Sequence, residues 1–219
     1  MLDEFIKKIN DVVKKTVSNS TDWVGQFIRP QLPSVKIETR IQALYSRGIS
    51  DKTRKKAITE IVVHGTGGGN GDVDQFVNWQ LGGERASDYN QGISLVHFVI
   101  GTDGRIVQTI DPKQYWVYHS SSVSHDEETI GIELCNSSYS NSNQYTDAQY
   151  TALAALCDKL MRENKSCRRI VSHNYNGKTY SALPKNCPGT VFDWARLKCD
   201  LDSRKWYGDI YLPEVILYG

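Results

Sequence analysis

Three residues that lie far apart in the chain have side chains of the types that bind metal ions. His64 and His173 each end an apolar run, and Cys187 lies in a polar turn that is bounded by prolines. Two imidazoles and one thiolate are typical ligands of Zn²⁺, and three protein ligands leave a fourth coordination position for water. The set therefore predicts a hydrolytic zinc site rather than a structural one.

The elements that must position these residues alternate between strands and helices from residue 58 onward. Apolar runs predict strands at residues 58–64, 95–101, 105–110, 130–135 and 168–173, with a hairpin turn at Thr102-Asp-Gly104. Helical patterns predict helices at residues 72–80, 146–163 and 190–198, the second of which Thr146 can cap. This order predicts an α/β fold with a single mixed β-sheet flanked by helices. Both histidines then end strands, where open sheets bind ligands.

The first 56 residues differ from the others in charge and pattern. They contain twelve Lys or Arg and six Asp or Glu, although the whole chain carries a net charge of only +1. Residues 2–17 predict an amphipathic helix that packs on its own domain or, alternatively, contacts a membrane surface or a partner. Residues 36–47 predict a second short helix. We therefore expect an N-terminal helical extension at residues 1–56, the main domain at 57–205, and a C-terminal tail at 206–219 that packs on it.

Composition excludes several classes of protein. No apolar run approaches the ~20 residues that span a bilayer, so no transmembrane segment is expected. Charged residues interrupt the apolar pattern at the N-terminus, which argues against a signal peptide and for synthesis in the cytoplasm. Five cysteines, an odd number, suit a reducing compartment, so buried thiols are favoured over a Cys157–Cys167 disulfide. The sequence has no stripe of basic residues, so no nucleic-acid partner is expected. We expect the protein to be a monomer.

Five short motifs occur in one order along the chain. They are Ile61-Val-Val-His-Gly-Thr66, Val96-His-Phe-Val-Ile100 with Thr102-Asp-Gly-Arg-Ile106, Thr129-Ile-Gly-Ile-Glu-Leu134, Val171-Ser-His173 and Pro184-Lys-Asn-Cys-Pro-Gly189. Together they resemble the zinc-dependent N-acetylmuramoyl-L-alanine amidases of phage endolysins, bacterial wall-recycling enzymes and peptidoglycan-recognition proteins. The resemblance covers about residues 57–200 and implies that the main domain is a zinc amidase domain acting on peptidoglycan.

The resemblance also implies a role for each matching residue. His64, His173 and Cys187 match the zinc ligands, the last of which is Asp in some members. Glu133 matches the catalytic carboxylate, and Lys185 matches a lysine that stabilises the oxyanion. General chemistry agrees, because zinc lowers the pKa of bound water towards ~7, a carboxylate can carry the proton, and a cation can stabilise the developing negative charge.

Substrate contacts are predicted at three further positions. His119 matches a family position in the substrate cleft, although Ser-Ser follows it here where Ala-Gly is frequent, and Thr66 ends the first motif. Trp116 could line a saccharide groove, but core packing explains it equally well. His97 is expected to make a structural hydrogen bond or one that supports a metal ligand, rather than to bind metal itself. His125 is expected to lie in a loop.

Two features depart from the family pattern. Val96 stands where some phage members have a catalytic tyrosine, which leaves Glu133 as the proton carrier. Thirteen residues separate His173 from Cys187, more than is common in the family, so this long segment must fold back to complete the site.

The motifs therefore predict a peptidoglycan hydrolase that cleaves the amide between N-acetylmuramic acid and L-alanine with zinc-activated water. A phage or prophage endolysin that acts on the cell wall is favoured, and a cytoplasmic wall-recycling enzyme is the nearest alternative. Two other classes stay open: a peptidoglycan-binding module without activity, and a cysteine hydrolase in which Cys187 is the nucleophile and His173 the base. The cysteine hydrolase would not need a metal ion.

Overall fold

One mixed β-sheet organises the molecule. The computed structural model describes residues 35–41, 52–69, 71–81, 95–136, 145–181, 185–205 and 216–218. Within them the sheet has seven strands in the order β1-β4-β3-β5-β2-β6-β7. They are β1 (Ile37–Thr39), β2 (Glu60–Gly65), β3 (Phe98–Ile100), β4 (Ile106–Gln108), β5 (Thr129–Leu134), β6 (Arg169–Ser172) and β7 (Ile216–Tyr218). Only the predicted β3–β4 hairpin is antiparallel among these pairs, so the expected mixed sheet is confirmed.

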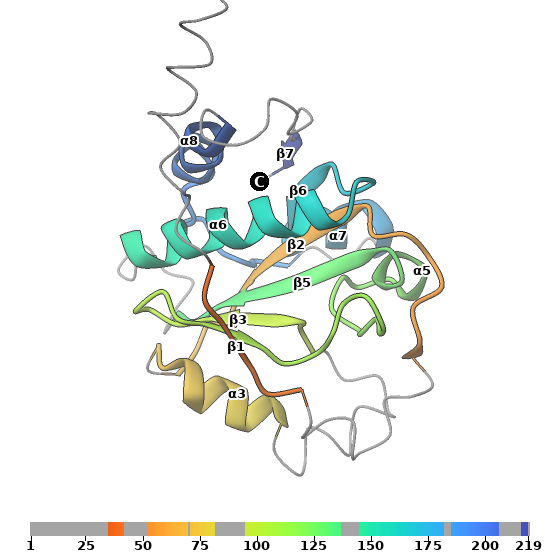
Figure 1. Ribbon diagram of the computed structural model, residues 1–219, viewed down its shortest axis with the longest axis horizontal. Helices are drawn as coiled ribbons and strands as arrows, with labels where there is room; N and C mark the ends of the chain where they lie inside the picture. The colour runs from red at the N-terminus through yellow and green to blue at the C-terminus, as the bar shows by residue number, and fades with distance from the viewer. Residues whose placement is uncertain are drawn as a thin grey trace, which may run out of the picture.

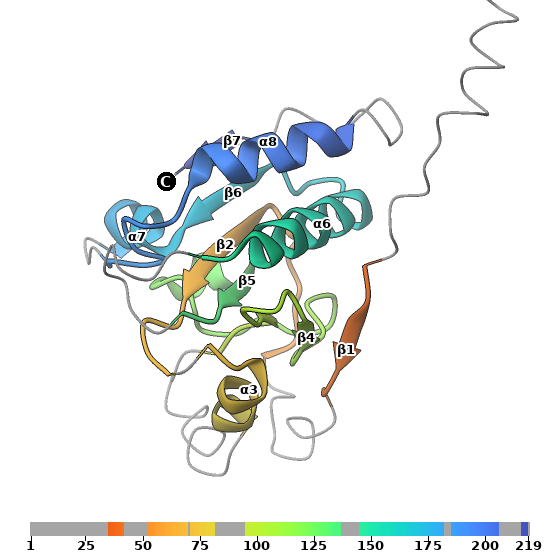
Figure 2. The same cartoon turned by 90° about the vertical axis from the view of Figure 1, so that its left-hand side faces the viewer.

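Helices cover both faces of this sheet. They are α3 (Val73–Leu81), α5 (Val123–Asp126), α6 (Asp147–Glu163), α7 (His173–Asn176), the π-helical turn η3 (Gly177–Ser181) and α8 (Trp194–Lys205). Helices α6 and α8 lie together on one side of the sheet, and α3 lies on the opposite side (Figures 1 and 2). No helix in the described ranges is long and apolar enough to cross a membrane.

Strand alternation divides the buried side chains between the two faces. Ile61 and Val63 of β2 belong to the larger core cluster, together with Leu153 of α6. Val99 of β3 packs instead with residues of α3 in a second cluster. Successive side chains of a strand point to opposite faces, so the face that carries α3 also receives His64, which lies between Val63 and Gly65. The His64 side chain therefore lies on the face of the sheet opposite α6.

Local capping sets where the two longest helices begin. Thr146 caps α6 as predicted: its hydroxyl accepts from the Gln149 amide, and the Gln149 side chain accepts from the Thr146 amide. Helix α8 begins at Trp194, four residues later than predicted. The Asp193 carboxylate accepts from the Arg196 amide at 2.9 Å, which is the hydrogen bond of an N-cap.

The edge of the sheet corrects the expectation for residues 36–47. A helix was predicted there, but Ile37–Thr39 form β1, with Ile37 opposite Ile106 of β4. The segment alternates apolar and polar side chains, and the exposed edge of β4 supplies backbone partners that a local pattern does not reveal. The prediction is thus wrong for these three residues. Strand β1 precedes position 57, the predicted start of the main domain, so the sheet includes residues of the predicted extension. The helix predicted at residues 2–17 lies outside the described residues.

All five cysteines are free thiols. Cys157 and Cys167 both belong to the larger core cluster, where they are fully buried. Burial raises the pKa of the Cys167 thiol to about 12, so the thiolate that disulfide exchange needs is suppressed. The structure thus agrees with the expectation of buried thiols.

Candidate metal centre

The structure brings His64, His173 and Cys187 together at one end of the sheet. His64 is the penultimate residue of β2, and His173 begins α7 directly after β6. Their Nδ1 atoms lie 3.1 Å apart, and the Cys187 Sγ lies 3.9 Å from the His64 Nδ1. All three donor atoms lie within 4.8 Å of one another. This arrangement could hold a metal ion between them.

The long segment before Cys187 folds back as the third ligand requires. Helix α7 and the turn η3 use up part of its length, and the Asn174 amide donates to the Cys187 carbonyl at 2.9 Å. The Gly65 amide donates to the Cys187 Sγ at 3.4 Å, which ties the thiol to the end of β2. Tyr145 adds a third tether, because its hydroxyl donates to the Pro188 carbonyl at 2.8 Å. The turn is therefore held at Cys187 by β2 and α7, and at Pro188 by Tyr145.

Burial keeps the two imidazoles neutral. The pKa of His64 lies well below its usual value, first because of burial and then because of His173 and His97. Burial and the charge of Lys185 lower the pKa of His173 to about 4. A metal ion binds the unprotonated nitrogen of an imidazole. Both histidines can therefore serve as ligands at neutral pH without first releasing a proton.

A cavity of about 320 Å³ opens at these three side chains. Glu133 is the register partner of His64 across β2 and β5, so both side chains leave the same face of the sheet. The cavity is lined by His64, Gly65, Thr66, Phe76, Trp79, Gln80, Leu95, Val96, His119, Glu133, His173, Lys185, Asn186 and Cys187. Seven of the eight predicted site residues thus meet at one cavity, and their individual roles stay predictions.

A family comparison agrees with this geometry. Residues 54–190 match the family model described as N-acetylmuramoyl-L-alanine amidase. The chain belongs to this amidase family. A curated relative, the 1,6-anhydro-N-acetylmuramyl-L-alanine amidase AmpD of Citrobacter freundii, is 35% identical over 108 residues, which cover 47% of this chain and 54% of the relative. The chain thus matches about half the length of that protein.

Solved structures resemble this amidase-family chain in fold. The N-acetylmuramoyl-L-alanine amidase LysC from Clostridium intestinale has a TM-score of 0.53 at 21% identity, covering 76% of this chain and 97% of that one. An endolysin of a Thermus scotoductus bacteriophage has a TM-score of 0.56 at 17% identity, covering 76% and 99%. At these identities the likeness shows the fold alone. The predicted family and fold class are confirmed.

Thr66 and Trp116, two of the predicted substrate contacts, lie in different places relative to the cavity. Thr66 lines the cavity, but its hydroxyl also donates to the Asn136 carbonyl at 2.7 Å and so joins the loops after β2 and β5. Trp116 is only 8% exposed and packs edge-on against Tyr118. It is not among the residues that line this cavity. A substrate contact of Trp116 stays a prediction that its position does not support.

His119 forms part of the cavity wall, although its side chain is almost wholly buried. The residue is 2% exposed, and its Nδ1 lies 3.2 Å from the His64 Nε2. Its own Nε2 lies 3.0 Å from the Thr129 hydroxyl. A Cβ at position 131 would lie 2.9 Å from the His119 ring, so Gly131 leaves the space that this ring occupies. Substrate binding by His119 stays a prediction, and its ring nitrogens face His64 and Thr129.

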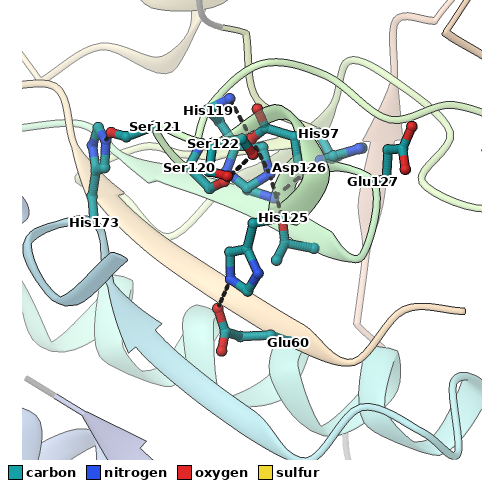
Figure 3. A network of polar contacts seen from close by, with 12 residues as sticks. Glu60, His97, His119, Ser120, Ser121, Ser122, His125, Asp126, Glu127 and His173 are labelled. Atoms are coloured by element: carbon teal, nitrogen blue, oxygen red, sulfur yellow. Dashed lines mark hydrogen bonds and ion pairs between the residues drawn. The ribbon is translucent and has the colours of Figure 1, made fainter. Parts of the chain in front are cut away.

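The other two histidines lie in buried polar contacts. His97 accepts a hydrogen bond from the Gly131 amide at 3.0 Å, as the expected structural role requires. His125 was expected in a loop, but it lies in α5 and its Nε2 is 2.7 Å from the Glu60 carboxylate (Figure 3). The expectation of a loop is therefore wrong. The Glu60 partner lies 65 residues away in the sequence, so the local pattern around His125 does not reveal it. Tertiary pairing buries the imidazole.

Aromatic residues of α3 reach the site without having been predicted there. Trp79 is 50% exposed and lies beside Phe76. Both residues line the cavity at His64, His173 and Cys187, and with Thr66 they also line a neighbouring hollow of about 300 Å³. Their spacing of three residues on a predicted helix was a usable signal, since such residues share one face. The site of this amidase-family chain is thus an extended groove rather than a single pocket.

Proposed function

We propose that this chain hydrolyses the amide bond between N-acetylmuramic acid and the L-alanine of the peptidoglycan stem peptide. One observation carries the proposal: three metal-type donors lie within 4.8 Å of one another in a cavity that Glu133 and Lys185 also line. Membership of the amidase family supplies the substrate class. Geometry supplies the residues that could perform the reaction.

The metal proposed for the site is zinc. Two neutral imidazoles and one thiolate are a donor set that Zn²⁺ favours, and three protein ligands suit a hydrolytic site. Each ligating imidazole also has a partner at its remote nitrogen, as second-shell contacts of zinc sites usually provide. When bound, zinc would polarise the scissile carbonyl and lower the pKa of a water molecule towards ~7.

Two side chains of the cavity perform the proton transfer and stabilise the developing negative charge. Glu133 accepts a proton from the attacking water and returns it to the alanine nitrogen as the carbon–nitrogen bond breaks. Val96 lines the cavity and has no group that titrates, which supports Glu133 as the proton carrier. The ammonium of Lys185 faces the carbonyl oxygen as negative charge develops on it. The products are a muramyl carboxylate and a stem peptide with a free amino group.

The extended groove fits a substrate with two arms. The scissile amide joins a sugar to a peptide, so both must extend away from the metal centre. The exposed ring of Trp79 offers an apolar surface on which a sugar or an alkyl side chain can pack. We assign the hollow beside α3 to one of these arms.

The decisive experiment measures release of stem peptide from purified peptidoglycan, with a chelator and then with added Zn²⁺. We expect chelation to abolish release and zinc to restore it. Cys187→Asp should keep part of the activity, because a carboxylate can ligate zinc. Cys187→Ala should lose it, and Cys199→Ala, at an exposed cysteine, is the matched control. A chelator-insensitive enzyme that Cys187→Asp inactivates would establish the cysteine hydrolase instead, and binding without release would establish a binding module.

Two substrates separate the two proposed biological roles. The curated relative is named for 1,6-anhydro-N-acetylmuramyl-L-alanine, a soluble wall fragment, and at 35% identity it favours wall recycling as a second candidate. An endolysin must cleave intact peptidoglycan, and this remains our leading proposal. Comparing rates on intact walls and on purified anhydromuropeptides distinguishes these roles. A rate on intact walls that is negligible beside the fragment rate would reject the endolysin.

Two finer proposals concern association. We expect the chain to be a monomer, which sedimentation of the zinc-loaded protein would test. We also propose that the amphipathic pattern at residues 2–17 contacts a membrane surface or a partner. Binding of the full chain to anionic vesicles, compared with a chain whose leucine, isoleucine and phenylalanine residues in this segment are replaced by serine, tests the membrane alternative.

A further inference from the structure

A short segment, residues 119–121, contacts both proposed histidine ligands on the side away from the proposed metal position. The side chains of His119 and Ser121 contact His64 and His173 respectively, in each case at the Nε2 atom. The Nδ1 atoms of the two ligands face each other across the proposed metal position. The segment thus contacts the two nitrogens that do not face the metal. One stretch of three residues thus contacts two rings from different elements, His64 of β2 and His173 of α7.

The contact to His173 is the more informative of the two. The Ser121 Oγ lies 2.9 Å from the His173 Nε2, and Figure 3 shows the Ser121 side chain beside the His173 ring. If Nδ1 binds a metal, the proton must reside on Nε2. Ser121 then accepts that hydrogen bond, which fixes both the tautomer and the rotation of the ring.

Ser121 holds a backbone conformation that serine rarely adopts. Its φ angle is +72°, in the left-handed region that glycine occupies without strain. Ser121 is the only residue other than glycine with a positive φ among the described residues. Strain of this kind persists where the surroundings over-determine the conformation, and it clusters at functional sites. A glycine would satisfy the backbone better, so the side chain at this position requires a separate explanation.

A buried carboxylate fixes the segment in place. The Asp126 Oδ1 accepts from the amides of His119 and Ser120, at 2.9 and 2.6 Å. Asp126 is 2% exposed and lies at the end of α5, so the turn is anchored inside the protein (Figure 3). The Ser121 hydroxyl is therefore presented to His173 by a rigid support.

We propose that Ser121 is a positioning residue, whose hydroxyl orients the His173 imidazole for metal binding and which the chain retains despite the strained backbone. The inference rests on the proposed zinc site, and it assigns to Ser121 a role in metal affinity rather than in contact with substrate. Outer-shell partners of this type typically change metal affinity by about 10–100-fold when they are removed.

Zinc affinity, measured by competition with a chromophoric chelator, tests the proposal without relying on activity. We expect Ser121→Gly and Ser121→Ala both to bind zinc about 10–100-fold more weakly than the unaltered chain. Ser124→Ala, at an exposed serine three residues away, should bind zinc with unchanged affinity. Absorption of the Co²⁺-loaded proteins should also differ for the two Ser121 variants, because the ring that ligates the ion is less well oriented.

The glycine variant separates positioning from folding. Because glycine relieves the left-handed strain, metal-free Ser121→Gly should unfold at a temperature equal to or above that of Ser121→Ala. Weaker zinc binding together with undiminished thermal stability supports the proposal. Unchanged zinc affinity in Ser121→Gly would overturn it. If the unaltered chain itself binds no zinc, the proposed function fails first, and the two failures are thereby distinguished.

Discussion

His64 and Glu133 are register partners on the neighbouring parallel strands β2 and β5. Opposite residues in a ladder leave the same face of the sheet at close distance. A proposed metal ligand and a proposed proton carrier are therefore fixed relative to each other by backbone pairing rather than by a flexible loop. Both line the same cavity, and Glu133 is 9% exposed.

This pairing predicts that Glu133 affects turnover and leaves metal binding unchanged. Glu133→Gln and Glu133→Ala should retain one zinc per chain and lose about 10²–10⁴-fold in turnover, the usual range for general acid–base catalysis. Metal content and the rate of stem-peptide release measure the two effects. Glu128→Gln, a partly exposed carboxylate near the start of β5, is the control and should leave both unchanged. Turnover that survives Glu133→Ala would refute the assignment.

Lys185 should affect the reaction through charge. Lys185→Met should lower turnover by about 10²–10³-fold, the range for loss of an oxyanion partner, with zinc still bound. The same change should raise the pKa of His173, because the charge of Lys185 lowers that pKa in the unaltered chain. Nuclear magnetic resonance titration of the metal-free protein reads the pKa, and a kinetic assay reads turnover. Lys165→Met, at an exposed lysine, should change neither quantity.

The stability of the metal-free protein should fall in acid. Burial and Lys185 lower the pKa of His173 to about 4, whereas an unfolded histidine titrates near 6.5. Between these values the unfolded chain binds a proton that the folded chain does not, so stability decreases as the pH falls from 6.5 towards 4. The contribution of His173 is about 3 kcal/mol, since one pKa unit corresponds to about 1.4 kcal/mol.

Urea unfolding of the metal-free protein at pH 7, 6 and 5 measures this loss. The pKa values of His64, His97 and His119 are lowered in the same direction, so the full decrease should exceed that of His173 alone. The variant His173→Gln should show a shallower pH dependence than the unaltered chain. An equal pH dependence in both proteins would contradict the assignment to His173.

Substitution of Gly65 should affect both stability and zinc binding, because the end of β2 meets Tyr145 and Pro188 at this position. A Cβ at this position would overlap the Tyr145 hydroxyl and lie 3.2 Å from the Pro188 carbonyl. Gly65→Ala should therefore displace the turn that carries Cys187, destabilise the fold by about 1–3 kcal/mol and weaken zinc binding. Gly68→Ala is a close control, since no atom lies within 4 Å of its added Cβ. Equal zinc affinities for both variants would show that the turn tolerates the displacement.

Helix α6 provides a prediction for stability alone. The Thr146 hydroxyl accepts from the Gln149 amide at 3.1 Å, and loss of such a cap costs about 1 kcal/mol. Thr146→Ala should lower the free energy of unfolding by that amount, as measured by urea denaturation. Thr146→Ser should keep most of the stability. Because α6 covers the face opposite the proposed metal centre, zinc affinity should stay unchanged in both variants.

Local sequence patterns were sufficient for most of the elements and for the types of the ligands. The apolar runs that become β2, β5 and β6, the turn of the β3–β4 hairpin and the Thr146 cap all depend on neighbouring residues. Hydrophobic periodicity and capping act over a few residues, so they can be read from the sequence directly. The family motifs then indicated which His and Cys residues belong together.

Only the tertiary structure decided the relationships that cross the sheet. The pairing of Ile37–Thr39 with β4, the burial of His125 against Glu60 and the contact of Ser121 with His173 join segments far apart in the chain. These contacts depend on strand order and register, and a local hydrophobic pattern in a single sequence reveals neither of them. The sequence by itself therefore determined which groups could perform the chemistry. The fold decided which side chains hold those groups in place, because orientation depends on partners that only the assembled sheet brings within hydrogen-bond distance.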